Sequence, residues 1–251
     1  MQADKALYLP GLKPVLEALE QKPRQILEIY IRENLSSKES AEIRKICEER
    51  KIPVKLVDAK TLDQLLGSKN QVNCQGAAAK IKPPSAVSLD ELLTAAPDAP
   101  LPLVLALDQI QDPGNLGALS RTAYALGCAG LLLPVHNGAL ISPGAMRSSA
   151  GALASLPRCE VANLARSLDE AAERDFAIYA AARSPASQNA YRVDWHFPAI
   201  LVLGNEGKGI RPGVLKRCAN SVVIPFRRDF DSLNIAQAAA ILISLISMAR
   251  G

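Results

Sequence analysis

Histidine is scarce in this chain of 251 residues, which contains only His136 and His196. Neither histidine has a Cys, His or carboxylate cluster near it in the sequence. The sequence therefore offers few residues for a zinc site or for a histidine-based catalytic triad. The five cysteines show no CxxC pair and no metal-ligand spacing: Cys47, Cys74, Cys128, Cys159 and Cys218. Each is expected to pack as a small apolar residue, and no metal site is predicted.

The chain also lacks a strong excess of charge of either sign. Its formal net charge of +4 and pI of about 8.8 permit a nucleic-acid partner without requiring one. The apolar segment at the start of the chain is too short for a signal peptide and contains charged residues. Polar residues interrupt the apolar C-terminal segment, so no membrane span is expected. With 49% hydrophobic residues and unpaired cysteines, the chain is expected to be globular and cytoplasmic.

The composition changes once, over a Pro- and Ala-rich stretch. Residues 83–100 have little apolar periodicity, apart from a possible helical turn at 89–93, and they predict a linker between residues 1–82 and 101–251. Before the linker, strands are predicted at 26–31 and 54–57 and helices at 37–50 and 61–66, which gives a small α/β domain.

After the linker, short apolar runs alternate with segments of helical period. The runs lie at 103–107, 130–133, 176–181, 199–203 and 222–224, and the helices at 116–126, 164–172 and 233–248. Strands that are apolar on both sides and alternate with helices predict an α/β domain with a parallel sheet covered on both faces. Ligands of such sheets bind at the carboxyl ends of the strands, which singles out three loops.

The first two loops follow the runs at 103–107 and 199–203. The first contains Asn115 and leads into a helix that carries Arg121, although Asn115 is equally suited to cap this helix and Arg121 to be a solvated charge. The second reads GNEGKG at 204–209, where three glycines allow close approach to a ligand or simply a tight turn. Its spacing matches neither the dinucleotide fingerprint nor the Walker loop.

The third loop precedes the C-terminal helix and contains Ser232-Leu233-Asn234. A polar triplet at the start of a buried helix is placed to bind a ligand at the helix's electropositive end. The alternative is that Ser232 is only the N-cap and the helix only core. The helix is apolar around most of its circumference, so both of its sides must be covered.

Taken in order, the motifs of the three loops resemble the SpoU family of RNA ribose 2′-O-methyltransferases, the TrmH-like branch of the knotted methyltransferases. The motifs are DPGNLGALSRTAYALG, LVLGNEGKGI and VVIP followed by SLNIAQAAAI. Residues 8–82, which contain LPGLKPVLEALEQKPRQILEIYI from residue 9, resemble a small α/β substrate-binding domain of the ribosomal L30e/L7Ae-like type. This domain occurs in bacterial 23S rRNA guanosine-2′-O-methyltransferases. The resemblance implies a deep trefoil knot between residues 203 and 245.

The resemblance further implies methyl transfer from S-adenosylmethionine to a ribose 2′-hydroxyl of RNA. The expected target is guanosine in 23S rRNA, with tRNA as the main rival and a non-catalytic, knotted RNA-binding protein as a lesser one. Cofactor contacts carry over to Gly204, Ile224 and Leu233. Catalytic and supporting positions carry over to Asn115, Arg121, Glu206, Ser232 and Asn234.

Two further implications concern Arg121 and the oligomeric state. Arg121 would contact the target ribose as the proposed base, with Asn115 orienting it, although a guanidinium is a poor base by ordinary rules. A homodimer is implied, in which two subunits pack near the C-terminal helix and complete the site. A helix buried wholly within its own subunit is the alternative.

One loop departs from the family pattern. After the third strand the chain reads Pro225-Phe226-Arg227-Arg228, so that an arginine replaces a glycine common in the family. The two arginines either contact RNA phosphates or form a solvated charge cluster with Asp229 and Asp231.

Overall fold

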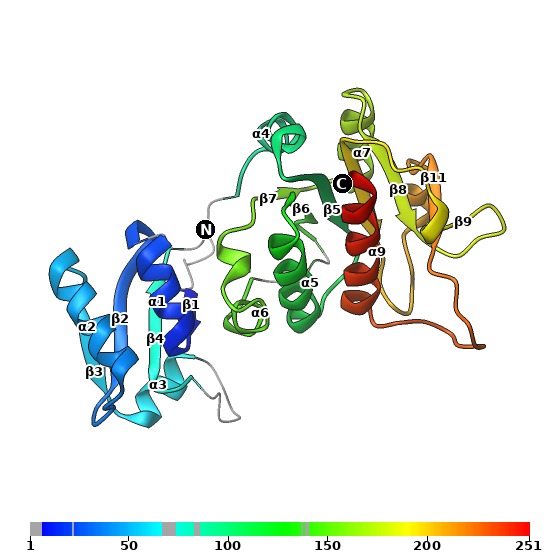
Figure 1. The fold of residues 1–251 in the computed structure, drawn as a ribbon. Coiled ribbons are helices and arrows are strands. Elements are labelled where there is room, and N and C mark those ends of the chain that lie inside the picture. The colour runs from blue at the N-terminus through cyan, green and yellow to red at the C-terminus, as the bar shows by residue number, and fades with distance from the viewer. Residues whose placement is uncertain (1–6, 22, 67–73, 83–85, 137, 139–140) are drawn as a thin grey trace.

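The computed structural model describes residues 7–21, 23–66, 74–82, 86–136, 138 and 141–251. Residues 1–6, on which the expectation about a signal peptide partly rests, and residues 83–85 of the predicted linker lie outside this set. The described chain forms two α/β units, which Figure 1 shows in blue to cyan for the N-terminal unit and in green to red for the second.

The N-terminal unit contains a four-stranded sheet in the order β1-β4-β2-β3. The strands are β1 (Leu7–Pro10), β2 (Ile26–Arg32), β3 (Val54–Val57) and β4 (Ala77–Ile81). Strand β4 pairs antiparallel with β1 and β2, whereas β2 and β3 are parallel. The strands predicted at 26–31 and 54–57 are thus confirmed.

Three helices cover this first sheet. Helices α1 (Leu12–Gln21) and α2 (Lys38–Arg50) contribute Leu19 and Ile43 to the same core as Ile29. The shorter α3 (Ala59–Leu65) buries Leu62 beside Tyr30 in a separate cluster. Residue Ser37 caps α2 by accepting the backbone N–H of Ser40, which explains why this helix begins where the sequence predicts.

The second unit contains a seven-stranded sheet in the order β7-β6-β5-β10-β8-β11-β9. Its strands are β5 (Leu101–Leu107), β6 (Cys128–Pro134), β7 (Arg158–Val161), β8 (Ala177–Ala181), β9 (Gln188–Asn189), β10 (Ala199–Leu203) and β11 (Asn220–Val223). Every pair of neighbouring strands is parallel, which confirms the prediction of a parallel sheet.

Helices cover both faces of the second sheet, and its strands are therefore buried on both sides. Helices α5 (Pro113–Ala125), α6 (Pro143–Ser148) and α9 (Ile235–Arg250) share one core with Leu105 and Leu201. Helices α4 (Leu89–Ala95), α7 (Leu164–Ala172) and α8 (Pro212–Leu215) share the opposite core with Val104 and Ile200. Figure 1 shows α5 and α9 side by side in front of the sheet.

The stretch predicted as linker and helix α6 make the contacts near the junction of the two units. Part of the stretch predicted as linker packs onto the second unit, since Leu92 and Leu93 of α4 are buried in its core and Val87 N donates to Arg158 O. Helix α6 packs against β1, and a Cβ on Gly151 would lie 3.2 Å from Leu9 Cδ1. Within the described residues, no helix combines the length and apolar character needed to cross a bilayer.

Candidate active site

The three predicted loops meet at the carboxyl edge of the second sheet. Strands β5 and β10 lie side by side with Leu107 paired to Leu203, so the segments that follow them start together. The loops are then joined directly, because Asp108 N donates to Leu203 O at 2.8 Å and Asn205 Nδ2 donates to Gln109 O at 3.1 Å. Residue Gln109 has a left-handed φ of 61°, an uncommon backbone conformation that this contact helps to hold.

An ion pair between a buried carboxylate and a partly exposed arginine fixes the far end of the second loop. The fully buried carboxylate of Asp108 accepts Arg211 Nε and Arg211 N, each at 2.7 Å, on its two oxygens. Arg211 Nη2 also lies 2.7 Å from Asp108 Oδ1. A buried carboxylate needs such partners because it has lost its hydration. The pair therefore anchors the loop 204–210 to the end of β5.

A polar cluster joins the starts of α5 and α9. Glu206 Oε1 accepts three N–H groups: Asn115 Nδ2 at 3.2 Å, Asn234 Nδ2 at 2.9 Å and Ile235 N at 3.0 Å. The Asn234 amide also donates to Asn115 Oδ1 at 2.9 Å. An ionised carboxylate at a helix N-terminus is favoured by the helix dipole. One residue from each predicted loop thus contributes to the cluster.

The structure corrects two candidate helix caps. Helix α9 is capped by Asn234, whose Oδ1 accepts Ala236 N and Gln237 N, and not by Ser232, because the helix begins two residues later than Leu233. Helix α5 is capped by Asp112, which accepts Asn115 N at 2.7 Å. The side chain of Asn115 is therefore free of capping and turns to Glu206.

The three predicted cofactor contacts line one pocket of about 430 Å³. These residues, Gly204, Ile224 and Leu233, face it together with Glu206 and Ser232 of the predicted catalytic set. At Gly204 a Cβ would lie 2.4 Å from Gly209 C and 2.5 Å from Ile210 N, so backbone there approaches backbone. A pocket of this size, lined by apolar side chains and a few polar and charged groups, suits a nucleoside-sized ligand.

The remaining catalytic candidate, Arg121, does not line this pocket. Its side chain is exposed on α5 and lines a second pocket, of about 310 Å³, between the two units. Tyr124 of α5 and Leu9 of β1 are also part of that second pocket. The structure therefore brings Asn115, Glu206, Ser232 and Asn234 to the carboxyl edge of the sheet and leaves Arg121 elsewhere within one chain.

The loop at residues 226–231 forms part of the outer wall of the larger pocket. Phe226 and Asp231 line it, and Arg183 lies over the Phe226 ring with its Cζ 5.3 Å from the ring centroid. Within this described loop, no ion pair joins Arg227 or Arg228 to Asp229 or Asp231. The charge-cluster alternative for these arginines is thus not realised in the structure.

Sequence reasoning missed Asp108, Arg211 and Arg183. For Asp108 a signal was present, because a lone carboxylate directly after an all-apolar strand is placed at the functional edge of the sheet. For Arg211 and Arg183 the sequence carries no comparable signal. Their roles depend on contacts with residues 103 and 43 positions away in the chain.

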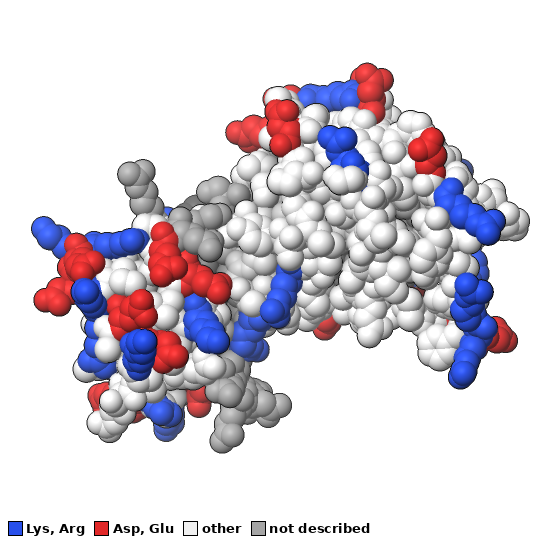
Figure 2. Space-filling model, viewed as in Figure 1, with Lys and Arg blue, Asp and Glu red and all other residues white. Residues whose placement is uncertain are grey.

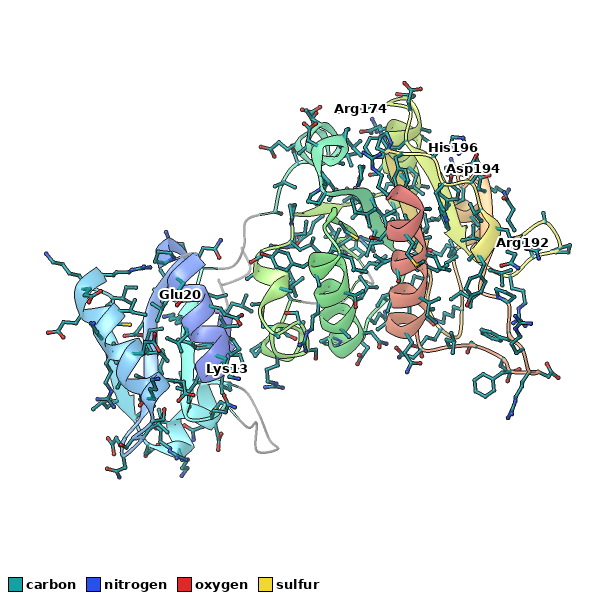
Figure 3. The ribbon with its side chains drawn as sticks, viewed as in Figure 1. Lys13, Glu20, Arg174, Arg192, Asp194 and His196 are labelled. Atoms are coloured by element: carbon teal, nitrogen blue, oxygen red, sulfur yellow. The ribbon has the colours of Figure 1, made fainter. Side chains whose placement is uncertain are left out.

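Other reactive side chains lie away from the site or are chemically inert. Figure 3 shows His196 near the C-terminal end of α9, opposite the end that carries the polar cluster. Burial, reinforced by the negative charge of Asp108, raises the pKa of the Cys218 thiol to about 12, so this thiol is a poor nucleophile. Among the described residues, no cluster of three or more His, Cys, Asp or Glu could hold a metal ion.

Comparison with known proteins assigns both units. Residues 102–244 match the SpoU rRNA Methylase family, and residues 8–87 match the family described as RNA 2′-O ribose methyltransferase substrate binding. The chain is 33% identical to a 23S rRNA (guanosine-2′-O-)-methyltransferase RlmB of Ralstonia nicotianae, over 94% of this chain and 93% of that protein. It is 29% identical to the protein of that name from Pseudomonas putida, over 92% of each chain.

A solved structure shares the fold. The SpoU methyltransferase AviRb from Streptomyces viridochromogenes, in complex with the cofactor AdoMet, superposes with a TM-score of 0.76. The match covers 97% of this chain and 90% of that chain, at 23% identity. With the first family matching more than half of the chain and the second matching the N-terminal unit, the chain belongs to the SpoU rRNA methylase family, whose members are S-adenosylmethionine-dependent RNA 2′-O-ribose methyltransferases.

Proposed function

We propose that this protein methylates the ribose 2′-hydroxyl of a guanosine in 23S rRNA. The observation that carries the proposal is the shared Glu206 carboxylate, which joins Asn115 and Asn234 beside the pocket lined by Gly204 and Leu233. The choice of 23S rRNA is supported by relatives that carry this name and match the chain over both units. The cellular location proposed is the cytoplasm, with which five free cysteines are compatible.

S-adenosylmethionine fits the larger pocket. At Gly204 the backbone of Gly209 and Ile210 occupies the place of a side chain, which keeps this stretch of the pocket lining compact, and Ile224 and Leu233 add apolar walls. These features suit an adenosyl group enclosed by backbone and apolar side chains. When bound, the cofactor supplies an electrophilic methyl on a sulfonium, which passes to the ribose oxygen as the carbon–sulfur bond breaks and the hydroxyl proton leaves.

The polar residues of the chain position the ribose. The cluster of Asn115, Glu206 and Asn234 fixes the starts of α5 and α9, and Ser232 lies next to it on the pocket wall. In a displacement of this kind, holding the oxygen about 3 Å from the methyl carbon supplies much of the rate. We assign Asn115 and Asn234 to orientation of the substrate and Glu206 to holding both asparagines in place.

We assign to Arg121 the stabilisation of the developing alkoxide. A guanidinium with a pKa above about 12 stays protonated, so it donates hydrogen bonds better than it accepts a proton. An RNA phosphate is the proposed carrier of the proton. Since Arg121 does not line the cofactor pocket in one chain, the Arg121 that acts there is proposed to come from a second copy.

A homodimer that packs through α5 and α9 would place Arg121 of the second copy at the cofactor pocket. Figure 2 shows that the face over α5 and α9 carries few charged side chains. On these adjacent helices, Tyr124 of α5 is 44% exposed and Met248 of α9 is 77% exposed, which is a large apolar exposure. We propose that this face packs against its equivalent in a symmetric pair.

The proposed architecture has three further parts. Residues 1–82 form the RNA-binding domain of the ribosomal L30e/L7Ae-like type, and residues 101–251 form the methyltransferase domain. The stretch 83–100 connects them, with α4 resting on the second domain. The chain between residues 203 and 245 is proposed to be threaded as a trefoil knot. The strand order is compatible with such a thread, with β8 between β10 and β11 although it precedes both in the chain.

The proposal is tested by incubating the protein with tritiated S-adenosylmethionine and either unmodified 23S rRNA or unmodified tRNA. Label is expected in the ribosomal RNA, on a guanosine ribose. Label in tRNA alone would replace the proposed target with the tRNA alternative. Label in neither pool, together with no S-adenosylmethionine binding by calorimetry, would favour a non-catalytic RNA-binding protein.

A further inference from the structure

Helix α6 is fixed against the first half of α5 by an unusually close contact. At Gly117 of α5, a Cβ would lie 2.4 Å from Ala145 O and 2.5 Å from Ser148 Cβ. The side chain of Ser149, which follows α6, is fully buried and donates to Met146 O. These contacts fix the position of the α6 backbone relative to α5. They therefore also fix the Cα position from which the Arg147 side chain projects.

Arg147 carries an unsatisfied buried donor. Its Nη1 is buried without a hydrogen-bond partner, and no ion pair to this guanidinium is found in the described part of the chain. A buried donor without a partner costs stability, more so when it is charged. A buried polar group of this kind calls for an explanation, and an acceptor supplied by a bound ligand is one.

The guanidinium lies next to the first turn of α5. A Cβ built on Gly144 would lie 4.0 Å from Arg147 Nη2 and 4.0 Å from Pro113 Cβ, so the arginine and the start of α5 border the same point. Pro113 is two residues before Asn115 of the polar cluster. The carboxylate in this turn, Asp112, is engaged in capping α5 and forms no ion pair with Arg147 in the described structure.

We infer that Arg147 is a positioning residue that binds a backbone phosphate of the RNA next to the target ribose. A guanidinium donates two parallel hydrogen bonds to a phosphate, so an arginine without an ion-pair partner in the described structure suits this group. The place of Arg147 near Pro113, two residues before Asn115, sets this phosphate near the first turn of α5. The inference rests on the proposed function, because it needs RNA as the substrate.

The test uses Arg147→Met, which removes the charge and the donors at similar length, and Arg147→Lys, which keeps the charge. The matched control is Arg166→Met on α7, an exposed arginine paired with Glu170. The measurements are the Kd for an unmodified 23S rRNA transcript at several salt concentrations, the Kd for S-adenosylmethionine by calorimetry, and the melting temperature.

For Arg147→Met we expect RNA affinity to fall about tenfold and the slope of log K against log salt to shrink by about 0.7 to 0.9. The cofactor Kd should not change. The melting temperature should stay level or rise, because a buried unsatisfied donor is removed. Arg147→Lys should keep the wild-type salt slope with intermediate affinity, and Arg166→Met should match the wild type.

An unchanged RNA affinity and salt slope in Arg147→Met would overturn the inference, whether or not the melting temperature falls. A weakened cofactor Kd with unchanged RNA binding would overturn it too and would assign Arg147 to the cofactor. If the unaltered protein fails to bind the transcript, the proposed function fails first, and the inference falls with it.

Discussion

Asn234 Nδ2 donates to Glu206 Oε1 at 2.9 Å and so connects the start of the last helix to the loop after β10. The same oxygen accepts Asn115 Nδ2 from α5 and Ile235 N from α9. One carboxylate oxygen thus holds together segments that are 91 and 28 residues away from it in the chain. This cluster is the structural centre of the proposed active site, and it suggests the first prediction.

Glu206→Ala should lower kcat/KM for RNA about 100-fold, because three N–H groups lose their shared acceptor and the helix starts are released. Glu206→Gln should keep most of the activity, since a neutral amide oxygen can still accept these bonds, although less strongly. Steady-state methylation assays on the two variants measure the difference. Equal losses in both variants would show that the negative charge matters, and not the shared acceptor.

Gly204→Ala should weaken cofactor binding about tenfold and destabilise the fold by about 1 to 3 kcal/mol. The new Cβ would lie 2.4 Å from Gly209 C, and backbone atoms cannot move aside as a flexible side chain can. The matched control is Gly213→Ala, because nothing lies within 4 Å of a Cβ at that position. Calorimetric titration and chemical denaturation measure both effects, and wild-type behaviour of Gly204→Ala would contradict the assignment of this pocket.

Arg121→Ala should lower the methylation rate about 100-fold or more while cofactor affinity stays constant, since Arg121 does not line the cofactor pocket. Arg121→Lys should recover little of this rate, because lysine lacks the planar fork of donors. Single-turnover assays with saturating RNA separate the chemical step from binding. Near-normal activity of the lysine variant would argue against a role for the fork.

Met248→Asp should convert a dimer into monomers, because a symmetric interface would bury the new charge twice. Light scattering after size exclusion should give about twice 26.8 kDa for the unaltered protein and 26.8 kDa for the variant. Leu56→Asp is the control, because this side chain is 52% exposed on the N-terminal sheet, away from α9. A monomeric unaltered protein would refute the proposed pairing.

Much of the second sheet could be predicted because its strands are short, apolar runs with turn residues at both ends. Strand β4, by contrast, reads Ala-Ala-Ala-Lys-Ile, a composition without β propensity, and it forms only because β1 and β2 pair with it on either side. Helix α6 escaped prediction since its six residues begin with Pro143 and Gly144 and show no helical period.

The candidate site was predictable in part for a similar reason. Asn115 and Asn234 stand out as polar residues at helix starts, but which of them caps a helix depends on where the helix begins. The contact of Asp108 with Arg211 spans 103 residues, and the unsatisfied nitrogen of Arg147 is defined only by what surrounds it. Such features depend on tertiary contacts that no local pattern encodes.

The central claim is that the pocket beside Glu206 directs a methyl group to a ribose oxygen of 23S rRNA, and nucleoside analysis tests it most directly. Unmodified 23S rRNA is incubated with the protein and S-adenosylmethionine, digested to nucleosides and examined by mass spectrometry. The account predicts 2′-O-methylguanosine with the unaltered protein and almost none with Glu206→Ala. A methyl group on a base, or equal ribose methylation by both proteins, would contradict it.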